Sequence, residues 1–444
     1  MTTNDTRDLG DGLVLRRATP DDTEPLVAFH AAVHADAGPG SPDDWVGAWV
    51  RDLMSGRHPT FRPDDFTLVE ETGNAAIVSS LCLISQTWSY DGIPFGFGRP
   101  ELVGTRADYR RRGLVREQMK LVHEWSAERG EQVQGITGIP NYYRQFGYEM
   151  ALELGGGRAG YAPHVPKLAE GCEEPFRIRP AVEADLPAIG RLYEAGCRRS
   201  LVSCLRDEAL WRYEIVVASA KNVNRRDVVL IESAGGERVG FLAHWAGPWH
   251  GVIGAAAYEL EPGVSWLAVT PSVVRYLWRT AEAAAAKEGT TAVHAFAFYL
   301  GTEHPAYRAF ETRLPRTHTP YAWYLRVPDL AGFVRHVAPA LEARLADSVA
   351  PGYSGEMRLS FYREGLRMAW EKGRLASVEK WDAASGEDGQ AAFPGLTFLH
   401  LLFGHRSLAE LKHAHTDCWT SGDEAPVVLD ALFPKRPSNV WPVT

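Results

Sequence analysis

Residues 103–116, VGTRADYRRRGLVR, are predicted to run from a β-strand through a basic turn into a helix. Such a turn exposes main-chain N–H groups at the positive end of the helix dipole, where an anion binds favourably. Gly113 lets the main chain approach a phosphate because it has no Cβ. Four arginines within residues 110–116 add guanidinium groups that pair with phosphate oxygens. The stretch therefore predicts a pyrophosphate or 3′-phosphate site, although a solvated basic turn would have the same residues.

The residues on either side predict an α/β layered domain. Apolar runs at residues 66–70 and 76–85 indicate strands, as do residues 101–105 and 133–137. Apolar residues at helical spacing indicate a helix from about Leu114 to Arg129. The Gly- and Pro-bearing segment 155–175 has little periodicity and is predicted to be a connector.

Two internal repeats in nearly one register predict a duplicated domain. LRRATPDD at residues 15–22 is echoed by IRPAVEAD at residues 178–185, and YRQF at 143–146 is echoed by YRAF at 307–310. Beyond about Asp329 an Ala/Leu-rich helix is followed by alternating apolar and polar residues at 357–362 and 366–370, and then by helical patterns. We therefore expect two similar domains and a third, α+β domain.

The loop resembles the acetyl-CoA loop of the GNAT superfamily of N-acetyltransferases. Its pattern is Q/R-x-x-G-x-G/A, and RRRGLV at residues 110–115 matches except that Val115 replaces the small residue. RRRGLVR further resembles the Eis-type aminoglycoside acetyltransferases. The resemblance implies acetyl-CoA as co-substrate, with the main chain of Val103 and Thr105 holding the pantetheine arm. It also places the cofactor's phosphates at Arg110, Arg111, Arg112, Gly113, Leu114 and Val115, chiefly through main-chain amides.

A second motif supplies a candidate acid. NYYRQFGY at residues 141–148 resembles the superfamily's F-Y-x-x-x-G-F signature, whose tyrosine protonates the departing thiolate. That role would fall to Tyr143, since a phenol with a pKa near 10 still holds its proton at neutral pH. A tyrosine that only packs against the sheet is the alternative.

The base and the acceptor pocket are less clear from sequence. In Eis-type enzymes the C-terminal carboxylate reaches the active site, which would assign the base to Thr444, although the usual aromatic terminal residue is missing here. A free terminus is the alternative. The segment from His30 to Trp49, which follows the first strand, is expected to cap the acceptor pocket. Asp36 would attract an ammonium group, and Trp45 and Trp49 would contact a cation or a ring.

The resemblance covers nearly the whole chain. It implies two tandem GNAT-type mixed-sheet domains, at residues 1–165 and 166–330, followed by a sterol-carrier-protein-like domain at 331–444. The second copy has Val269 to Tyr276 at the loop position, with no glycine and one arginine, so we expect it not to bind CoA. We expect the third domain to position the C-terminus, with lipid binding in an apolar tunnel as the alternative.

Composition excludes several classes of protein. A net charge of −9 argues against a general nucleic-acid binder and favours a cationic substrate. Five scattered cysteines without a C-x-x-C pair suggest neither a disulfide framework nor a zinc site, and we expect no metal. The sequence contains no run of about 20 apolar residues, the length that a membrane span requires. Its polar N-terminus lacks the features of a secretory signal. We therefore expect a cytoplasmic protein without membrane partners.

We expect an N-acetyltransferase that transfers an acetyl group to a small polyamine-like or aminoglycoside-like amine by direct attack. One alternative is a lipid or hydrophobic-ligand carrier with vestigial GNAT domains. Another is an enzyme that acetylates protein or peptide amines. The Eis-type resemblance also implies a homo-oligomer, specifically a hexamer.

Overall fold

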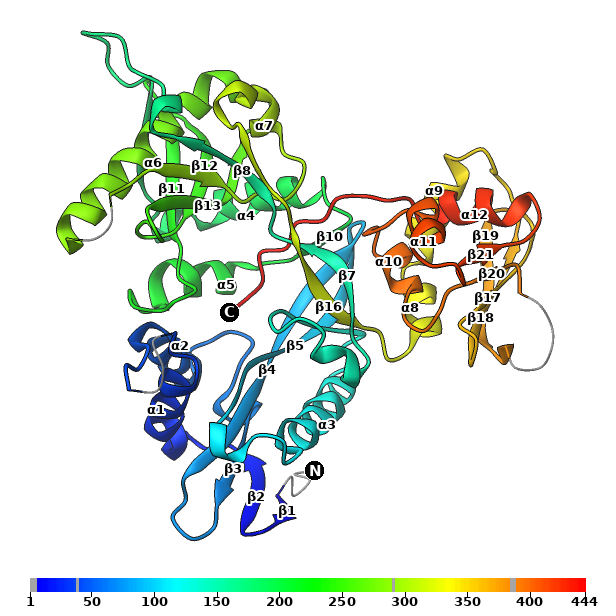
Figure 1. Ribbon diagram of the computed structural model, residues 1–444. Coiled ribbons are helices and arrows are strands. Elements are labelled where there is room, and N and C mark those ends of the chain that lie inside the picture. Colours follow the sequence, from blue (N-terminus) through cyan, green and yellow to red (C-terminus); the bar gives the residue numbers. More distant parts are fainter. Residues whose placement is uncertain (1–5, 37–39, 290–291, 384–388) are drawn as a thin grey trace.

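The protein is described from a computed structural model, which covers residues 6–36, 40–289, 292–383 and 389–444 (Figure 1). Within those residues the chain forms three sheets of nine, seven and five strands. None of the helices in this part of the chain is long and apolar enough to cross a membrane.

The first sheet has helices on both faces. Helices α1 (Thr23–Val33) and α2 (Asp44–Met54) bury their apolar residues against one face, and α3 (Leu114–Glu128) packs on the other. Successive strand residues point to opposite faces of the sheet. Leu68 therefore packs in the core under α1 and α2, and Val69 packs in the core under α3. The strand order is β1 (Arg7–Gly10), β2 (Leu13–Arg17), β3 (Phe66–Glu71), β4 (Ile77–Tyr90), β5 (Ile93–Thr105), β6 (Val133–Ile136), β16 (Tyr321–Arg326) and β7 (Glu149–Leu154), with β10 (Val202–Cys204) paired to β4.

The second sheet repeats this plan. Helices α4 (Leu186–Cys197) and α5 (Glu208–Arg212) cover one face, and α6 (Trp266–Glu288) covers the other, followed by the short α7 (Pro305–Ala309). Its only parallel pair among the described strands, β13 with β14, matches β5 with β6 of the first sheet. The order is β15 (Arg316–His318), β8 (Gly157–Tyr161), β14 (Ala295–Phe298), β13 (Val252–Leu260), β12 (Arg238–His244), β11 (Asp227–Ser233) and β9 (Phe176–Pro180). The predicted duplication is confirmed.

The two sheets exchange a strand. Strand β8 follows β7 of the first sheet in the chain, yet it pairs with β14 and β15 of the second. Strand β16 follows β15 of the second sheet, yet it pairs with β6 and β7 of the first. The sheets therefore do not separate at residue 165, and the domain boundaries given above remain a prediction.

The third domain packs on the far end of the β4–β5 hairpin. Its apolar core is continuous with that of the first domain, and the Tyr90 hydroxyl donates a 2.8 Å hydrogen bond to the main-chain oxygen of Leu402. It contains α8 (Leu330–His336), α9 (Ala338–Ala346), β17 (Gly355–Ser360), β18 (Gly365–Glu371), β19 (Arg374–Trp381), β20 (Ala391–Ala392), α10 (Phe398–Leu402), α11 (Leu408–Ala414), β21 (Trp419–Thr420) and α12 (Glu424–Leu432). From there the last residues run back between the other two domains (Figure 1).

Candidate active site

A cleft opens where β5 separates from β6. The two strands pair in parallel only at Phe97 with Val133 and at Gly98 with Gln134, so the later part of β5 has no partner on this side within the described residues. The pairing of β5 with β4 shifts register between Ser80 and Cys82, and the opposite residue, Leu102, has a φ of 53°. A bulge of this kind bends a strand and turns its side chains and main-chain groups in new directions.

The basic turn lies at the mouth of this cleft. Arg111 and Gly113 have positive φ values of 64° and 79°, and Gly113 is the N-cap of α3. Within the described part of the chain, the main-chain N–H groups of residues 111–115 have no hydrogen bond acceptor. Five free amides at the N-terminus of a fifteen-residue helix are suited to an anion, and the predicted phosphate site at this turn remains a prediction.

The turn and the end of β5 line a cavity of about 820 Å³. Of the predicted cofactor residues, the cavity brings together all eight: Val103, Thr105, Arg110, Arg111, Arg112, Gly113, Leu114 and Val115. Arg112 forms a 3.0 Å ion pair with Asp11, whereas Arg111 has no ion pair in the described residues. The cavity therefore keeps positive charge available for a ligand.

Tyr143 lies in the wall behind the cavity. Its side chain is 3% exposed, and its ring packs edge-on against Tyr142, which does line the cavity. Burial, with a smaller contribution from the negative charge of Glu101, raises the pKa of the Tyr143 phenol. The phenol is thus fully protonated at neutral pH, and no described residue hydrogen-bonds to its hydroxyl.

Two further titratable groups, His34 and Glu101, lie close to one another beside the cavity. His34 lines it, and its Nε2 atom is buried without a hydrogen bond partner among the described residues. Burial lowers the pKa of His34, and the charge of Glu101 opposes that shift. Glu101 in turn forms an ion pair with the buried guanidinium of Arg99. Glu101 therefore lies close enough to act on both His34 and the phenol of Tyr143.

The C-terminal residues contact the same part of the sheet from the other side. The main-chain oxygen of Val443 accepts hydrogen bonds from Gln86 Nε2 at 2.9 Å and from Arg99 Nη1 at 3.0 Å. Thr444 is 9% exposed and lies beside His58. Thr444 is outside the set of residues that line the cavity, and the Arg99 guanidinium that bonds to Val443 also forms an ion pair with Glu101. Its role as base remains a prediction.

None of the three residues predicted for acceptor binding lines the cavity. Asp36 is exposed at the end of α1, Trp45 is 48% exposed, and Trp49 is buried within α2. Residues 37–39 of the same predicted segment lie outside the described part of the structure. The assignment of the three stays a prediction.

Sequence reasoning missed Glu101 and Arg99. The available signal was a pair of charged residues in β5, a largely buried strand that contains mostly apolar residues and glycine. Charged residues in a buried strand are paired or functional, and these two are both paired and close to the cavity.

Comparisons with known proteins agree with this arrangement. Residues 14–151 match the model of the acetyltransferase (GNAT) domain family. No curated protein matches the sequence significantly. A probable N-acyltransferase from Enterococcus faecalis V583 is 12% identical, with a TM-score of 0.65 over 97% of this chain and 99% of that one.

Two other solved structures share the full-length fold. A GCN5-related N-acetyltransferase from Kribbella flavida is 18% identical, with a TM-score of 0.61 over 96% of this chain and 97% of that one. Eis1 from Mycobacterium abscessus is 12% identical, with a TM-score of 0.57 over 97% of this chain and 99% of that one. Members of the matched family typically use an acyl-CoA donor. The expected fold, two tandem GNAT-type domains and a sterol-carrier-protein-like domain, is confirmed. Residues 14–151 therefore form a domain of the GNAT acetyltransferase family, and the chain as a whole has the three-sheet fold of the Eis1 structure.

Proposed function

We propose that the protein transfers an acetyl group from acetyl-CoA to an amine of a small, multiply charged acceptor, of the polyamine or aminoglycoside class. The observation that carries the proposal is the row of five unbonded amides at residues 111–115, which faces the cleft between β5 and β6. A diphosphate is the anion that such a row of amides and neighbouring arginines accommodates best.

Acetyl-CoA fits the residues present. The amides of residues 111–115, with Arg110 and Arg111, would hold its phosphates, and the free main-chain edge at Val103 and Thr105 would hold the pantetheine arm. The bound thioester supplies an activated acetyl group. The amine attacks the thioester carbonyl directly, so that a C–N bond forms as the C–S bond breaks.

Tyr143 is the proposed acid. Its phenol is protonated at neutral pH, because burial raises its pKa, and no described residue competes for its hydroxyl. Proton transfer from the phenol neutralises the departing thiolate and blocks the reverse reaction.

The attacking amine must lose a proton and be held in place. Glu101 would contribute a negative charge that attracts a cationic acceptor. The residues at the mouth of the cleft are arginines and would repel it. His34 is held neutral by burial, and its ring lines the cavity, so it is suited to accept the proton of the amine. The carboxylate of Thr444 is the second proposed base, and Asp36, Trp45 and Trp49 are proposed to contact the outer part of the acceptor.

An amine screen tests the proposal. Release of the CoA thiol is followed with acetyl-CoA and, separately, spermidine, an aminoglycoside and a lysine-containing peptide. Turnover with spermidine or with the aminoglycoside is the expected result. Turnover with the peptide alone would reassign the protein to protein-amine acetylation. Absence of turnover combined with absence of acetyl-CoA binding would favour the lipid-carrier alternative. Light scattering on the same sample tests the proposed homo-hexamer.

A further inference from the structure

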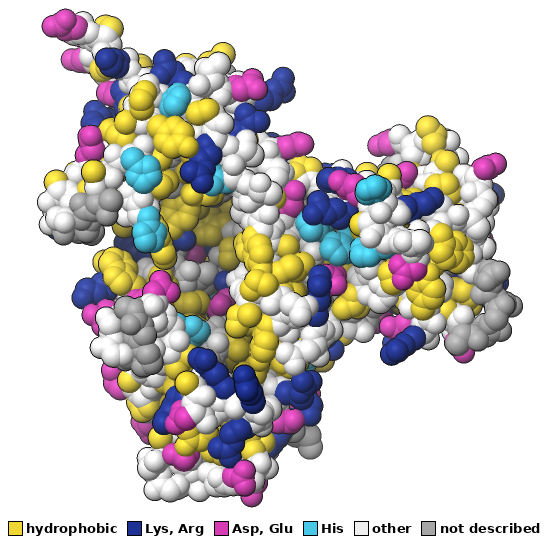
Figure 2. All heavy atoms as spheres, viewed as in Figure 1, with side chains coloured by type: hydrophobic (Ala, Val, Ile, Leu, Met, Phe, Trp, Pro, Cys, Tyr) yellow, Lys and Arg dark blue, Asp and Glu magenta, His cyan; other side chains and the backbone are white. Residues whose placement is uncertain are grey.

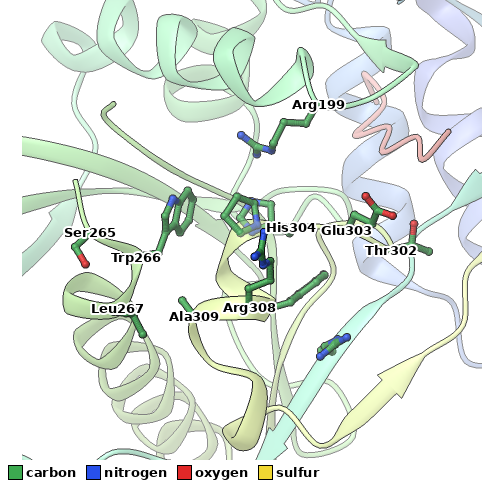
Figure 3. Close-up of a pocket in the computed structure, with 12 residues that line it drawn as sticks. Arg199, Ser265, Trp266, Leu267, Thr302, Glu303, His304, Arg308 and Ala309 are labelled. Atoms are coloured by element: carbon green, nitrogen blue, oxygen red, sulfur yellow. The ribbon is translucent and has the colours of Figure 1, made fainter. Parts of the chain in front are cut away.

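The second domain has its own cavity, of about 890 Å³, at the position that corresponds to the first cleft (Figure 3). In the first domain the cavity lies between the end of α1, the start of α3 and residues 139–146. In the second it lies between residue 199, just after α4, the start of α6 and residues 302–309. The two cavities are therefore equivalent parts of the duplicated domain.

The chemistry of the second cavity differs from that of the first. The segment that the sequence placed at the loop position, residues 269–276, lies inside helix α6, so that placement is wrong. The turn that leads from β13 into α6 is residues 261–265, which contains a glycine but no arginine. Tyr307, the equivalent of Tyr143, has a hydroxyl that is already hydrogen-bonded. It accepts a hydrogen bond from the amide of Leu300 at 3.0 Å and donates one to the main-chain oxygen of Phe298 at 3.0 Å. The second cavity therefore lacks both an arginine-bearing loop and a free phenol.

Cations nevertheless line it. Arg158 enters from the exchanged strand β8, and Arg308 from α7. Neither guanidinium has an ion pair or hydrogen bond with any residue that the structure describes, and Arg158 lies over the ring of Tyr307 at 5.6 Å. Arg199, the third cation, is paired with Glu259. Two unpaired guanidinium groups at one cavity leave a net positive charge beside the single acidic lining residue, Glu303.

A buried hydrogen bond donor lies at the same wall. The amide of Ala306 donates a 3.2 Å hydrogen bond to Nδ1 of His304, which fixes the neutral ring with its proton on Nε2. That Nε2 atom is buried and has no hydrogen bond partner in the described residues, since the nearest carboxylate oxygen, of Glu259, is 3.6 Å away. Figure 3 shows the His304 ring beside Trp266, Arg199 and Arg308. A buried donor without an acceptor is costly unless a ligand or water satisfies it.

An aromatic surface completes the site. Trp266 is the first residue of the 23-residue helix α6, its indole is partly exposed at the cavity, and its ring stands at 89° to that of His304. The amides of Trp266 and Leu267, at the positive end of this helix, have no main-chain acceptor in the described residues. A planar group can stack on the indole while an anionic group lies among the helix end and the guanidinium groups.

We propose that the second domain binds a small organic anion that carries a planar ring, with Arg158 and Arg308 pairing with the anionic group and Trp266 stacking on the ring. The anion is a phosphate or a carboxylate, and a nucleoside monophosphate has the required combination of charge and ring. The site is separate from the acetyl-transfer cleft, and a ligand there would bind without being acetylated.

The test is a calorimetric titration of AMP, adenosine and inorganic phosphate into the full chain. It is made in a background in which R110Q, R111Q and R112Q disable the first cleft. We expect one AMP site per chain, with affinity at least tenfold above that of phosphate or adenosine. The double variant R158Q/R308Q is expected to weaken AMP binding at least tenfold, and W266A to abolish the preference for AMP over phosphate. R177Q, an exposed arginine on β9 outside the cavity, is the matched control and should leave binding unchanged.

Several results would overturn the proposal. These are absence of AMP binding in the R110Q/R111Q/R112Q background, binding that survives R158Q/R308Q, or equal affinity for AMP and phosphate. If AMP binds only when the loop arginines are intact, the adenylate occupies the first cleft instead. Unchanged thermal unfolding of R158Q/R308Q confirms that a loss of binding is not a loss of folding.

Discussion

The guanidinium of Arg99 donates a 3.0 Å hydrogen bond to the main-chain oxygen of Val443, 344 residues further along the chain. The same guanidinium forms an ion pair with Glu101, next to the bulge that opens the active-site cleft. In the space-filling view, the face between the first two domains is hollowed, and the ribbon ends there (Figures 1 and 2). The last residues of the chain are therefore bonded to the strand whose end lines the candidate active site.

Deleting Val443 and Thr444 is expected to lower both stability and activity. Val443 is fully buried, and its removal loses about 1.5–3 kcal/mol of apolar burial together with hydrogen bonds from Gln86 and Arg99. Urea unfolding measures the first effect and CoA release the second. A chain with one glycine appended after Thr444 is the matched control, since it keeps Val443 and displaces only the terminal carboxylate. Full turnover of that control would eliminate the carboxylate as the base.

Replacing Tyr143 by phenylalanine is expected to lower kcat about 10²-fold or more, because the departing thiolate loses its proton donor. The affinity for acetyl-CoA should stay nearly the same, since the substitution removes one hydroxyl and leaves the residues that line the cofactor cavity unchanged. The adjacent Tyr142→Phe variant is the control and should retain most of its turnover. An unchanged rate in Tyr143→Phe would remove this residue as the acid.

Replacing Glu101 by glutamine is expected to raise KM for the amine at least tenfold and to leave acetyl-CoA binding unchanged. The carboxylate contributes negative charge beside His34, and glutamine keeps its shape without that charge. Steady-state kinetics with both substrates separates the two effects. Glu128→Gln, at the end of α3 and exposed, provides the comparison. An amine KM equal to that of the wild type would contradict a role for Glu101 in acceptor binding.

The protein should lose stability as the pH falls from about 6.5 towards 4, in part because of His58. Burial lowers the pKa of His58 to about 4, although the main chain of Thr444 opposes the shift. In this window the unfolded chain binds a proton that the folded chain does not, so stability increases with pH. The full effect of one such histidine is of the order of 3 kcal/mol.

His58→Asn is therefore expected to flatten the dependence of the urea midpoint on pH between 4 and 6.5. The slope will not vanish, because burial also lowers the pKa of His123 and His405, each to about 3. An identical slope in the wild type and the variant would show that His58 does not titrate in this way.

The features that were predictable from sequence are local. The arginine turn consists of a strand end, a glycine with positive φ and a helix start. All three lie within the fourteen residues 103–116, so a local sequence pattern was enough to predict the turn. The duplication was visible because the repeats at 15–22 and 178–185 both form a strand that leads into a capped turn and a helix.

The strand exchange and the second cavity were not predictable in this way. The sequences of residues 157–161 and 321–326 are compatible with a strand in either sheet. Only tertiary packing determines which sheet each strand joins. Because the second copy lacks an arginine loop, the sequence predicted no CoA site there. It gave no indication of the cavity that Arg158, Trp266 and Arg308 line together. Glu101 approaches His34 through the bulge at Leu102, which local periodicity does not indicate.

The most direct test of the proposed function is a calorimetric titration of acetyl-CoA into three proteins: the wild type, a variant with R110Q, R111Q and G113V, and the R158Q/R308Q variant. We expect one tight site per chain in the wild type, its loss in the loop variant, and its retention when the second cavity is altered. Absence of binding to the wild type, or binding that survives the loop changes, would contradict the assignment of the first cleft as the acetyl-CoA site.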